Sequence, residues 1–394
     1  MKKALRNTSL FLRYAFHWIR LTNEIRYYKA PPILLCMANP GSIGGTELQI
    51  QIIAEALKSR LGDCVVLLSG KLEGDKSNLF VERLKSLKIP CLRLESLGLV
   101  PYDQWPFLKK RTARLLGKAI GNSKICHFFN PSSTVLTPVM KSIGLAVYYM
   151  ETGMPTAEGW WKTLHTTIGQ FDYVTSVSLA GLHRLESLYG YQGPSCVTPS
   201  MFRLPPGHFL CRKPMKGVFD IVYFGRMTRG KGVDLLIRAF HHLIKEFPSA
   251  KLSLIGSGER VPLLRDLVQE LQLSDHVQFT DWLQNEALFS RLIASDLFCL
   301  PSFSEGLPSS ILEAMSIGLP VVATDVGGVS EIIEHDVSGI LIPPRDEEAL
   351  TKVLLELADA PLRRLQLREE ALLRWKKVGT QEVIINQLMT AYQI

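Results

Sequence analysis

Short apolar runs alternate with helix-like segments along the chain, and this alternation is the strongest constraint on the fold. In the first half, the runs lie at 33–38, 64–68, 125–129, 146–150 and 173–177. Helical spacing between them occurs, for example, at 46–60 and 107–120. Continuous apolar runs of this length are typical of parallel strands buried on both faces, and parallel strands need a crossover such as a helix. The pattern therefore predicts an α/β protein built from βαβ units.

The series stops at a segment rich in glycine and proline, 188–214, and then starts again. The runs of the second half lie at 220–224, 251–255, 277–279, 297–300, 321–323 and 339–342. At 394 residues, the chain exceeds the size at which a single core usually stops growing. We therefore expect two Rossmann-like domains, over 31–200 and 201–378, joined by a linker. Such folds bind ligands at the carboxyl ends of their sheets, which predicts a cleft between the domains.

The first thirty residues (1–30) form a basic arm. They hold seven Lys and Arg against one Glu, so the remaining chain carries only +2 of the net charge of +8. The stretch SLFLRYAFHWIRL interleaves apolar and aromatic residues with Arg13 and Arg20, as a helix in a membrane interface does. The stretch is too short and too charged to span a bilayer, and no small-residue cleavage site follows it. The arm is predicted to contact a membrane surface, with packing on the protein's own surface as the alternative.

The charge distribution limits the kinds of partner that we expect, and the cysteines indicate the cellular compartment. No nucleic-acid recognition motif accompanies the arm, so we expect no nucleic-acid partner. The seven cysteines include no Cys-x-x-Cys pair, and several lie in apolar runs, where a free thiol behaves as a small hydrophobe. This usage fits a reducing cytosol. We expect a cytoplasmic protein, peripheral on the membrane if the arm binds there.

The loop NPGSIGGTE, residues 39–47, joins the first predicted strand to the first predicted helix. Gly44 and Gly45 permit close approach of a ligand to backbone N–H groups, and Thr46 suits the N-cap. The helix N-terminus that follows favours an anion. Taken alone, however, such a loop is also what a plain tight turn looks like.

A second glycine-rich loop follows the predicted strand 220–224 in the sequence VYFGRMTRGKG. It carries Arg226 and Lys231. Two fixed cations at the carboxyl end of a strand can hold a diphosphate and stabilise the charge that develops as it leaves. Each cation in isolation would be a solvated loop residue, and the carboxylates downstream favour the binding site.

Two glutamates, Glu305 and Glu313, flank the start of a predicted helix in SEGLPSSILEAMSIGLP. Pro308 suits the first helical turn, and Gly318 with Pro320 marks the end of the helix. Eight residues at 100° each place Glu313 about two turns on and roughly 80° around the helix, so that both carboxylates can face one site. One can accept hydrogen bonds from hydroxyls of a sugar ring and the other from a ribose, while the helix N-terminus offers N–H groups to phosphates.

Together these motifs resemble the retaining glycosyltransferases of family 4, which have the GT-B fold. The resemblance rests on the Gly-Gly loop, on Gly-Arg…Lys-Gly, on Pro-Ser-x-x-Glu-Gly with a second glutamate eight residues on, and on GLPVVATDVGG. It is dense from 220 to 344 and thinner from 33 to 197.

The resemblance implies a role for each matching residue. The donor-binding set is Gly44, Gly45, Arg226, Lys231, Glu305, Gly306, Leu307 and Glu313. In that set, Arg226 and Lys231 hold the donor diphosphate, Glu305 the donor sugar and Glu313 the ribose. The glycines approach the phosphates from the other domain. The resemblance also implies that the C-terminal helix, 379–394, packs back on the first domain.

No Asp-x-Asp occurs in the chain, in agreement with an enzyme that needs no metal or other cofactor because Arg and Lys supply the positive charge. Two departures from the family pattern stand out. Residues 199–202 read Pro-Ser-Met-Phe at the linker, and Glu151 stands where the family often has a histidine.

Three residues of the first half are candidates for work on the acceptor. Glu151 can orient the acceptor or accept its proton and joins Glu305, Arg226 and Lys231 as a candidate catalytic residue; a carboxylate that caps the next turn is the alternative. His127 and Asn130, at the end of another strand, are candidate acceptor contacts, with a satisfied structural histidine as the alternative for the former.

The resulting prediction is a retaining glycosyltransferase that moves a sugar from a nucleoside-diphosphate donor to a hydroxyl of a glycan or lipid-linked acceptor, in bacterial polysaccharide or glycolipid biosynthesis. The alternatives are a nucleotide-sugar epimerase or phosphorylase on the same fold, and a catalytically silent subunit that binds a nucleotide sugar. A dehydrogenase is disfavoured because no Gly-x-Gly-x-x-Gly joins a strand to a helix.

Overall fold

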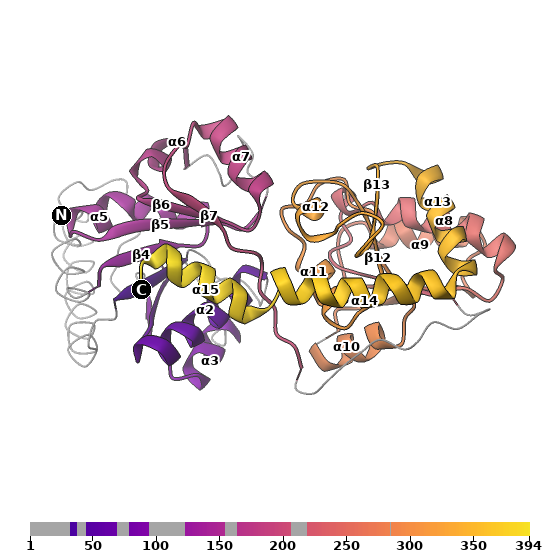
Figure 1. Ribbon diagram of the computed structural model, residues 1–394, viewed down its shortest axis with the longest axis horizontal. Coiled ribbons are helices and arrows are strands. Elements are labelled where there is room, and N and C mark those ends of the chain that lie inside the picture. The colour runs from indigo at the N-terminus through magenta and orange to yellow at the C-terminus, as the bar shows by residue number, and fades with distance from the viewer. Residues whose placement is uncertain are drawn as a thin grey trace, which may run out of the picture. The chain divides into compact units, whose positions relative to one another are not determined.

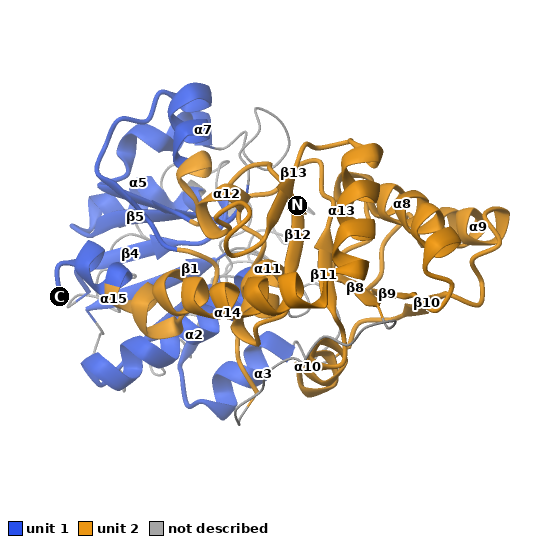
Figure 2. Cartoon of the chain, turned by 45° about the vertical axis from the view of Figure 1, so that its right-hand side comes forward, with its two compact units in different colours: residues 1–176, 182–198, 387–394 blue, residues 177–181, 199–386 orange. Residues whose placement is uncertain are grey.

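The computed structural model describes residues 32–37, 45–68, 79–93, 123–153, 164–205, 219–283 and 285–394. The chain divides into two compact units (Figure 2). Unit 1 comprises 1–176, 182–198 and 387–394, and unit 2 comprises 177–181 and 199–386. The predicted arm, 1–30, and the predicted helix at 107–120 lie outside the described residues.

Unit 1 is built on a parallel sheet of seven strands in the order β3-β2-β1-β4-β5-β6-β7 (Figure 1). Its strands are β1 (Ile33–Met37), β2 (Val65–Leu68), β3 (Cys91–Arg93), β4 (Ile125–Phe128), β5 (Ala146–Glu151), β6 (Tyr173–Ser176) and β7 (Ser195–Val197). Its longer helices are α2 (Gly45–Leu61), α3 (Leu79–Ser86), α5 (Thr137–Ser142) and α7 (Leu179–Tyr189), the first turn of which belongs to unit 2. The central strands are fully buried, which explains why they appear in the sequence as continuous apolar runs.

Unit 2 has a parallel sheet of six strands in the order β10-β9-β8-β11-β12-β13. The strands are β8 (Asp220–Phe224), β9 (Lys251–Ile255), β10 (Val277–Thr280), β11 (Leu297–Leu300), β12 (Val321–Thr324) and β13 (Ile340–Ile342). The strand order reverses between β8 and β11. In open α/β sheets, ligands bind at such a reversal, beyond the carboxyl ends of the strands.

Helices cover both faces of the second sheet (Figure 1). They are α8 (Val233–Glu246), α9 (Val261–Glu270), α10 (Asn285–Ile293), α11 (Ser309–Ser316), α12 (Val329–Ile332), α13 (Glu347–Asp359) and α14 (Pro361–Val378). Helix α8 packs on α13, and α14 on α11. The side chain of Asp346 accepts the N–H of Ala349 at 2.8 Å and so caps the start of α13.

The structure confirms the predicted fold class, since each unit is a parallel α/β layer. Two strands, β3 and β7, were not predicted. Each is three residues long, and the partly exposed β7 lies at the edge of its sheet inside the segment 188–214 that was predicted as a linker. Each holds one polar residue among its three, so neither forms a continuous apolar run, whereas the equally short edge strand β13 is apolar throughout.

The last helix, α15 (Gln381–Tyr392), ends in unit 1 (Figure 1). Tyr392 is 2% exposed, and its hydroxyl lies 2.6 Å from Nδ1 of His127 in β4. The hydroxyl of Tyr148 in β5 donates to the carbonyl of Ala391 at 3.0 Å. The end of α15 is therefore part of the packing of the first sheet.

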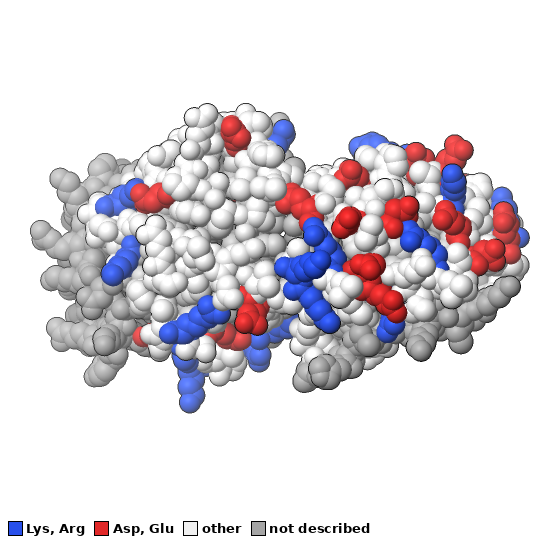
Figure 3. Space-filling model, in the orientation of Figure 1, with Lys and Arg blue, Asp and Glu red and all other residues white. Residues whose placement is uncertain are grey.

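Basic and acidic side chains are interspersed on the face of unit 2 that Figure 3 shows, including over α14. None of the helices within the described ranges is long and apolar enough to cross a membrane.

Candidate functional site

The loop that follows β8 makes direct contact with the loop that follows β11. Gly232 has a φ of +61°, and a Cβ there would lie 2.1 Å from the carbonyl oxygen of Pro301. The N–H of Phe303 donates to the carbonyl of Gly230 at 2.7 Å. Glycine at 232 therefore lets the two loops meet at the reversal of strand order.

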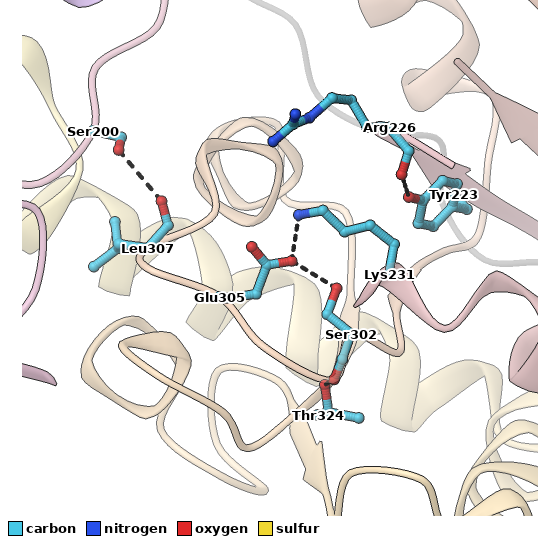
Figure 4. A network of polar contacts seen from close by, with 8 residues as sticks. All are labelled: Ser200, Tyr223, Arg226, Lys231, Ser302, Glu305, Leu307 and Thr324. Atoms are coloured by element: carbon cyan, nitrogen blue, oxygen red, sulfur yellow. Dashed lines mark hydrogen bonds and ion pairs between the residues drawn. The ribbon is translucent and has the colours of Figure 1, made fainter. Parts of the chain in front are cut away.

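Within this contact Glu305 pairs with Lys231. The ammonium Nζ of Lys231 lies 2.6 Å from Oε1 of Glu305 (Figure 4). The Glu305 side chain is 8% exposed and that of Lys231 21%. A carboxylate so far removed from water needs charged or hydrogen-bonding partners, and both loops supply them.

A second donor reaches the same carboxylate oxygen. The hydroxyl of Ser302 donates to Oε1 of Glu305 at 2.6 Å, and the hydroxyl of Thr324 at the end of β12 donates to the carbonyl of Ser302. Ser302 and Thr324 are both fully buried. Ser302 thus holds the Glu305 carboxylate directly, and Thr324 holds the backbone of Ser302 (Figure 4).

The loop after β12 holds the backbone on the other side of Glu305. Gly327 has a φ of +58°, and a Cβ there would lie 1.8 Å from the carbonyl oxygen of Glu305. The N–H of Gly328 donates to the carbonyl of Gly306 at 2.8 Å. These contacts fix the backbone of the segment Glu305–Leu307. The hydroxyl of Ser200 also donates to the carbonyl of Leu307 at 3.3 Å.

Arg226 follows β8 and is exposed. Its carbonyl accepts a hydrogen bond of 2.8 Å from the hydroxyl of Tyr223, which fixes its backbone, while its guanidinium extends to the same side as the ammonium of Lys231 (Figure 4). Burial raises the pKa of Tyr223, so this hydroxyl keeps its proton and donates. Both cations of the loop are available to one polyanion.

Glu313 lies on α11, after the N-cap position at Pro308. Burial raises the pKa of Glu313 to about 7, and a hydrogen bond from Ser309 partly opposes the rise. Such a carboxyl group is poised between its two protonation states near neutral pH. The first turn of α11 also presents N–H groups that favour an anion.

The candidates in unit 1 are held by contacts within the unit. Glu151, 1% exposed, ends β5 and accepts from the Tyr149 hydroxyl at 2.7 Å and from the N–H of Gly153 at 2.9 Å. The second contact caps the turn after β5, as the alternative interpretation expected. Gly45 begins α2, and Gly44 lies outside the described residues.

His127 and Asn130 also serve their own unit. His127 is fully buried, Nδ1 lies 2.6 Å from the Tyr392 hydroxyl, and Nε2 lies 3.4 Å from the Thr175 hydroxyl. Burial lowers the pKa of His127 to about 3, so the ring is neutral. The side chain of Asn130 accepts the N–H of Ser133 at 3.2 Å and caps the short helix η3 (Pro131–Leu136). The contacts of His127 match the structural alternative given for that residue, and the role of Asn130 as an acceptor contact stays a prediction.

The structure thus joins Lys231, Ser302 and Glu305 by hydrogen bonds, with Gly306 and Leu307 next to Glu305 in the chain. Arg226 lies on the loop that carries Lys231, and Glu313 lies on α11. Ser302 and Thr324 were not predicted as site residues. The available signal was a polar residue at the end of each of two otherwise apolar runs, where strand ends gather around a site. Among the described residues no group of three or more His, Cys, Asp or Glu side chains could hold a metal ion.

Residues 213–374 match the family model described as glycosyl transferases group 1, and this stretch contains every site residue just described in unit 2 except Ser200. This part of the chain is therefore similar to the group 1 glycosyltransferases. The amylovoran biosynthesis glycosyltransferase AmsK of Erwinia amylovora is 34% identical over 144 residues, which cover 35% of this chain and 35% of that protein.

A second curated relative is the GDP-mannose-dependent monoacylated alpha-(1-6)-phosphatidylinositol monomannoside mannosyltransferase of Corynebacterium glutamicum. It is 30% identical over 232 residues, which cover 54% of this chain and 60% of that protein. The chain therefore spans less than two thirds of the length of these relatives.

Among solved structures, HepE of Anabaena in complex with UDP superposes with a TM-score of 0.75 at 18% identity, over 91% of this chain and 99% of that one. At this identity the likeness shows the fold alone. It confirms the predicted GT-B fold class for the chain as a whole.

Proposed function

We propose that this chain is a retaining glycosyltransferase that transfers a sugar from a nucleoside-diphosphate donor to a hydroxyl of a glycan or lipid-linked acceptor. The observation that carries the proposal is the ion pair between Lys231 and Glu305 at the reversal of strand order in unit 2. It sets a cation and a carboxylate side by side, as a ligand with both phosphates and hydroxyls requires. The stretch that contains the pair matches the model of the group 1 family.

Each residue has one task in this proposal. Arg226 and Lys231 bind the diphosphate and stabilise the negative charge that grows on it as it leaves, the work that a metal ion does elsewhere. Glu305 accepts hydrogen bonds from hydroxyls of the donor sugar, and Glu313 from those of the ribose. The bond between the anomeric carbon and the diphosphate oxygen breaks, and a bond to the acceptor oxygen forms on the same face. The proton of the acceptor hydroxyl passes to the departing diphosphate.

The relatives support the choice of substrate class without fixing its members. The name of one specifies amylovoran biosynthesis, and the name of another specifies GDP-mannose and a phosphatidylinositol mannoside. The solved neighbour holds UDP. The proposal therefore extends to bacterial polysaccharide or glycolipid biosynthesis, at the cytoplasmic face of a membrane that the arm 1–30 contacts.

Ligand-induced thermal stabilisation tests the donor site. UDP, GDP and ADP are added to the wild type and to Arg226→Ala/Lys231→Ala. A ligand at about 100 times its Kd stabilises the native state by about 2.7 kcal/mol. One diphosphate should raise the unfolding midpoint of the wild type and not that of the double variant. The matched control is Arg238→Ala/Lys245→Ala, which removes one arginine and one lysine from exposed positions of α8 and should respond as the wild type does.

Two further outcomes separate the proposal from its rivals. If no diphosphate raises the midpoint of the wild type, the nucleotide-sugar proposal is wrong. If one diphosphate does raise the midpoint, the nucleotide sugars with the same base are incubated with and without glycan and lipid-linked acceptors, and the products are separated by chromatography. An epimerase converts its nucleotide sugar without an acceptor, whereas a silent subunit binds and releases it unchanged.

A further inference from the structure

We infer that Ser302 is a positioning residue for the donor sugar: it holds one oxygen of Glu305 so that the other faces the sugar hydroxyls. The inference rests on the proposed function and assigns a task to a residue that carries no charge and is fully buried. Ser302 acts through Glu305 and does not itself touch the ligand.

Only one of the two carboxylate oxygens of Glu305 is occupied by hydrogen-bond donors among the described residues. Both Lys231 Nζ and Ser302 Oγ lie 2.6 Å from the same atom, Oε1 of Glu305. Within the part of the chain that the structure describes, Oε2 of Glu305 has no hydrogen-bond partner, and in Figure 4 it points away from Ser302 and Thr324. A carboxylate oxygen can accept two hydrogen bonds. Oε2 is therefore the atom that can take hydroxyls of a sugar ring.

A bound diphosphate would draw the ammonium of Lys231 away from Glu305. The ammonium is a mobile point charge on a flexible stem, and a diphosphate competes with Glu305 for it. Ser302 faces no such competition because it is buried and uncharged. Its backbone is held as well, since the Thr324 hydroxyl donates to its carbonyl. When Lys231 turns toward phosphate, Ser302 is the donor that keeps the carboxylate in place.

The loss of Lys231 and the loss of Ser302 should therefore affect different parts of the donor. Lys231 serves both the diphosphate and Glu305, so its loss weakens the binding of every nucleotide. Ser302 serves only the orientation of Glu305, so its loss should weaken the binding of the sugar moiety alone. The telling quantity is a selectivity ratio, defined as the affinity for a nucleotide sugar divided by the affinity for the matching diphosphate.

The experiment measures this ratio by titration calorimetry with UDP and UDP-glucose and with GDP and GDP-mannose. Ser302→Ala should lower the ratio at least fivefold for the pair that binds, while the affinity for the diphosphate stays within twofold. Ser338→Ala is the matched control, because Ser338 is equally buried and accepts the N–H of Glu334 at 3.0 Å elsewhere in the same unit; it should leave the ratio unchanged.

A double-mutant cycle tests whether Ser302 acts through Glu305. In a Glu305→Gln background, Ser302→Ala should lower the ratio no further. If Ser302→Ala does not fold, Ser302→Cys keeps a side chain of the same shape, with a larger atom and a weaker donor, and should give an intermediate fall. Thr324→Val, which leaves Ser302 in place but removes the donor to its carbonyl, should lower the same ratio.

The outcomes distinguish this inference from the function on which it rests. If the wild type binds none of the diphosphates UDP, GDP and ADP, the proposed function is wrong and the inference falls with it. If the wild type binds a diphosphate and Ser302→Ala weakens both ligands equally, or weakens neither, only the positioning role is wrong. The same holds if the variant lowers the ratio as much without Glu305 as with it.

Discussion

Lys231 and Glu305 lie 74 positions apart in the chain and form an ion pair of 2.6 Å between the loops that follow β8 and β11. The pair is largely shielded from water, unlike the surface pair of Lys141 and Asp172, whose side chains are 38% and 40% exposed. The free energy of unfolding depends more strongly on both partners of a shielded pair than on those of an exposed pair, because a single buried charge without its counterpart is costly.

Lys231→Met should therefore weaken both binding and stability. We expect diphosphate affinity to fall at least tenfold, because a hydrogen bond to a charged group contributes about 1.5–3 kcal/mol. The free energy of unfolding should fall by about 1–3 kcal/mol, since Glu305 loses its cation. Urea unfolding and calorimetry measure the two effects. Lys141→Met is the control for an exposed pair and should cost less than about 1 kcal/mol; equal losses in the two variants would contradict the argument.

Gly327→Ala should displace the Glu305 loop. The added Cβ would meet the carbonyl oxygen of Glu305 at 1.8 Å in a left-handed backbone conformation. Gly62→Ala separates the two causes, because Gly62 has a φ of +83° and nothing within 4 Å of the added carbon. Backbone strain alone costs about 1–2 kcal/mol, so the loss in unfolding free energy should be larger at 327 than at 62. Diphosphate stabilisation should weaken only at 327, and its survival there would show that the loop tolerates displacement.

The protonation of Glu313 should make stability depend on pH. Its pKa is raised to about 7 in the native state by burial, above its ordinary value of 4.5. The neutral form is favoured by folding, so this contribution is fully present below pH 4.5 and is lost as pH rises through 7. Glu313→Gln removes the dependence. The difference in unfolding free energy, variant minus wild type, should rise by an amount on the order of 2 kcal/mol between pH 5 and pH 8. Glu348→Gln, at an exposed position of α13, should track the wild type, and parallel curves for Glu313→Gln would refute the prediction.

The same shift should couple donor binding to proton release. In the proposed site the ribose hydroxyls donate to an ionised Glu313, so binding of a nucleoside diphosphate near pH 6.5 should expel a fraction of a proton. Calorimetric titrations in two buffers of different ionisation enthalpy measure this proton. Glu313→Gln should reduce the release; an unchanged value would place the ribose elsewhere.

Tyr392→Phe should destabilise unit 1. It leaves Nδ1 of the buried His127 without its partner at 2.6 Å, and an unpaired buried polar group costs about 1–3 kcal/mol. Tyr191→Phe is the comparison, because the hydroxyl of Tyr191 donates to the carbonyl of Pro194 at 2.8 Å in an exposed setting. Thermal unfolding should show a clear fall for position 392 and little change for position 191.

Much of the sheet architecture could be predicted because buried parallel strands leave a simple pattern. The bounds expected for the runs at 220–224, 251–255 and 297–300 are those of β8, β9 and β11. The edge strands β3 and β7 left no such pattern because each has three residues, one of them polar, whereas the equally short β13 is apolar throughout. Helix α2 begins and ends within one residue of the predicted range 46–60.

The site was predictable only in part, for a physical reason. Residues that carry charge and follow a strand end can be placed at one edge of a sheet from sequence alone, which is how Lys231 and Glu305 were paired with one ligand. The support by Ser302 and Thr324 depends on how two loops cross in space, 22 positions apart in the chain, and no local periodicity encodes that crossing. The pairing of His127 with Tyr392, 265 positions apart, was out of reach for the same reason.

The hydrogen bond between His127 and Tyr392 also has a consequence for synthesis on the ribosome. Residues 387–394 belong to unit 1 but are translated after the whole of unit 2. Chains fold from the N-terminus as they emerge, domain by domain. Part of the surface of the first sheet therefore stays uncovered until the second unit has been synthesised. A nascent chain arrested before residue 387 would expose the site that Tyr392 fills.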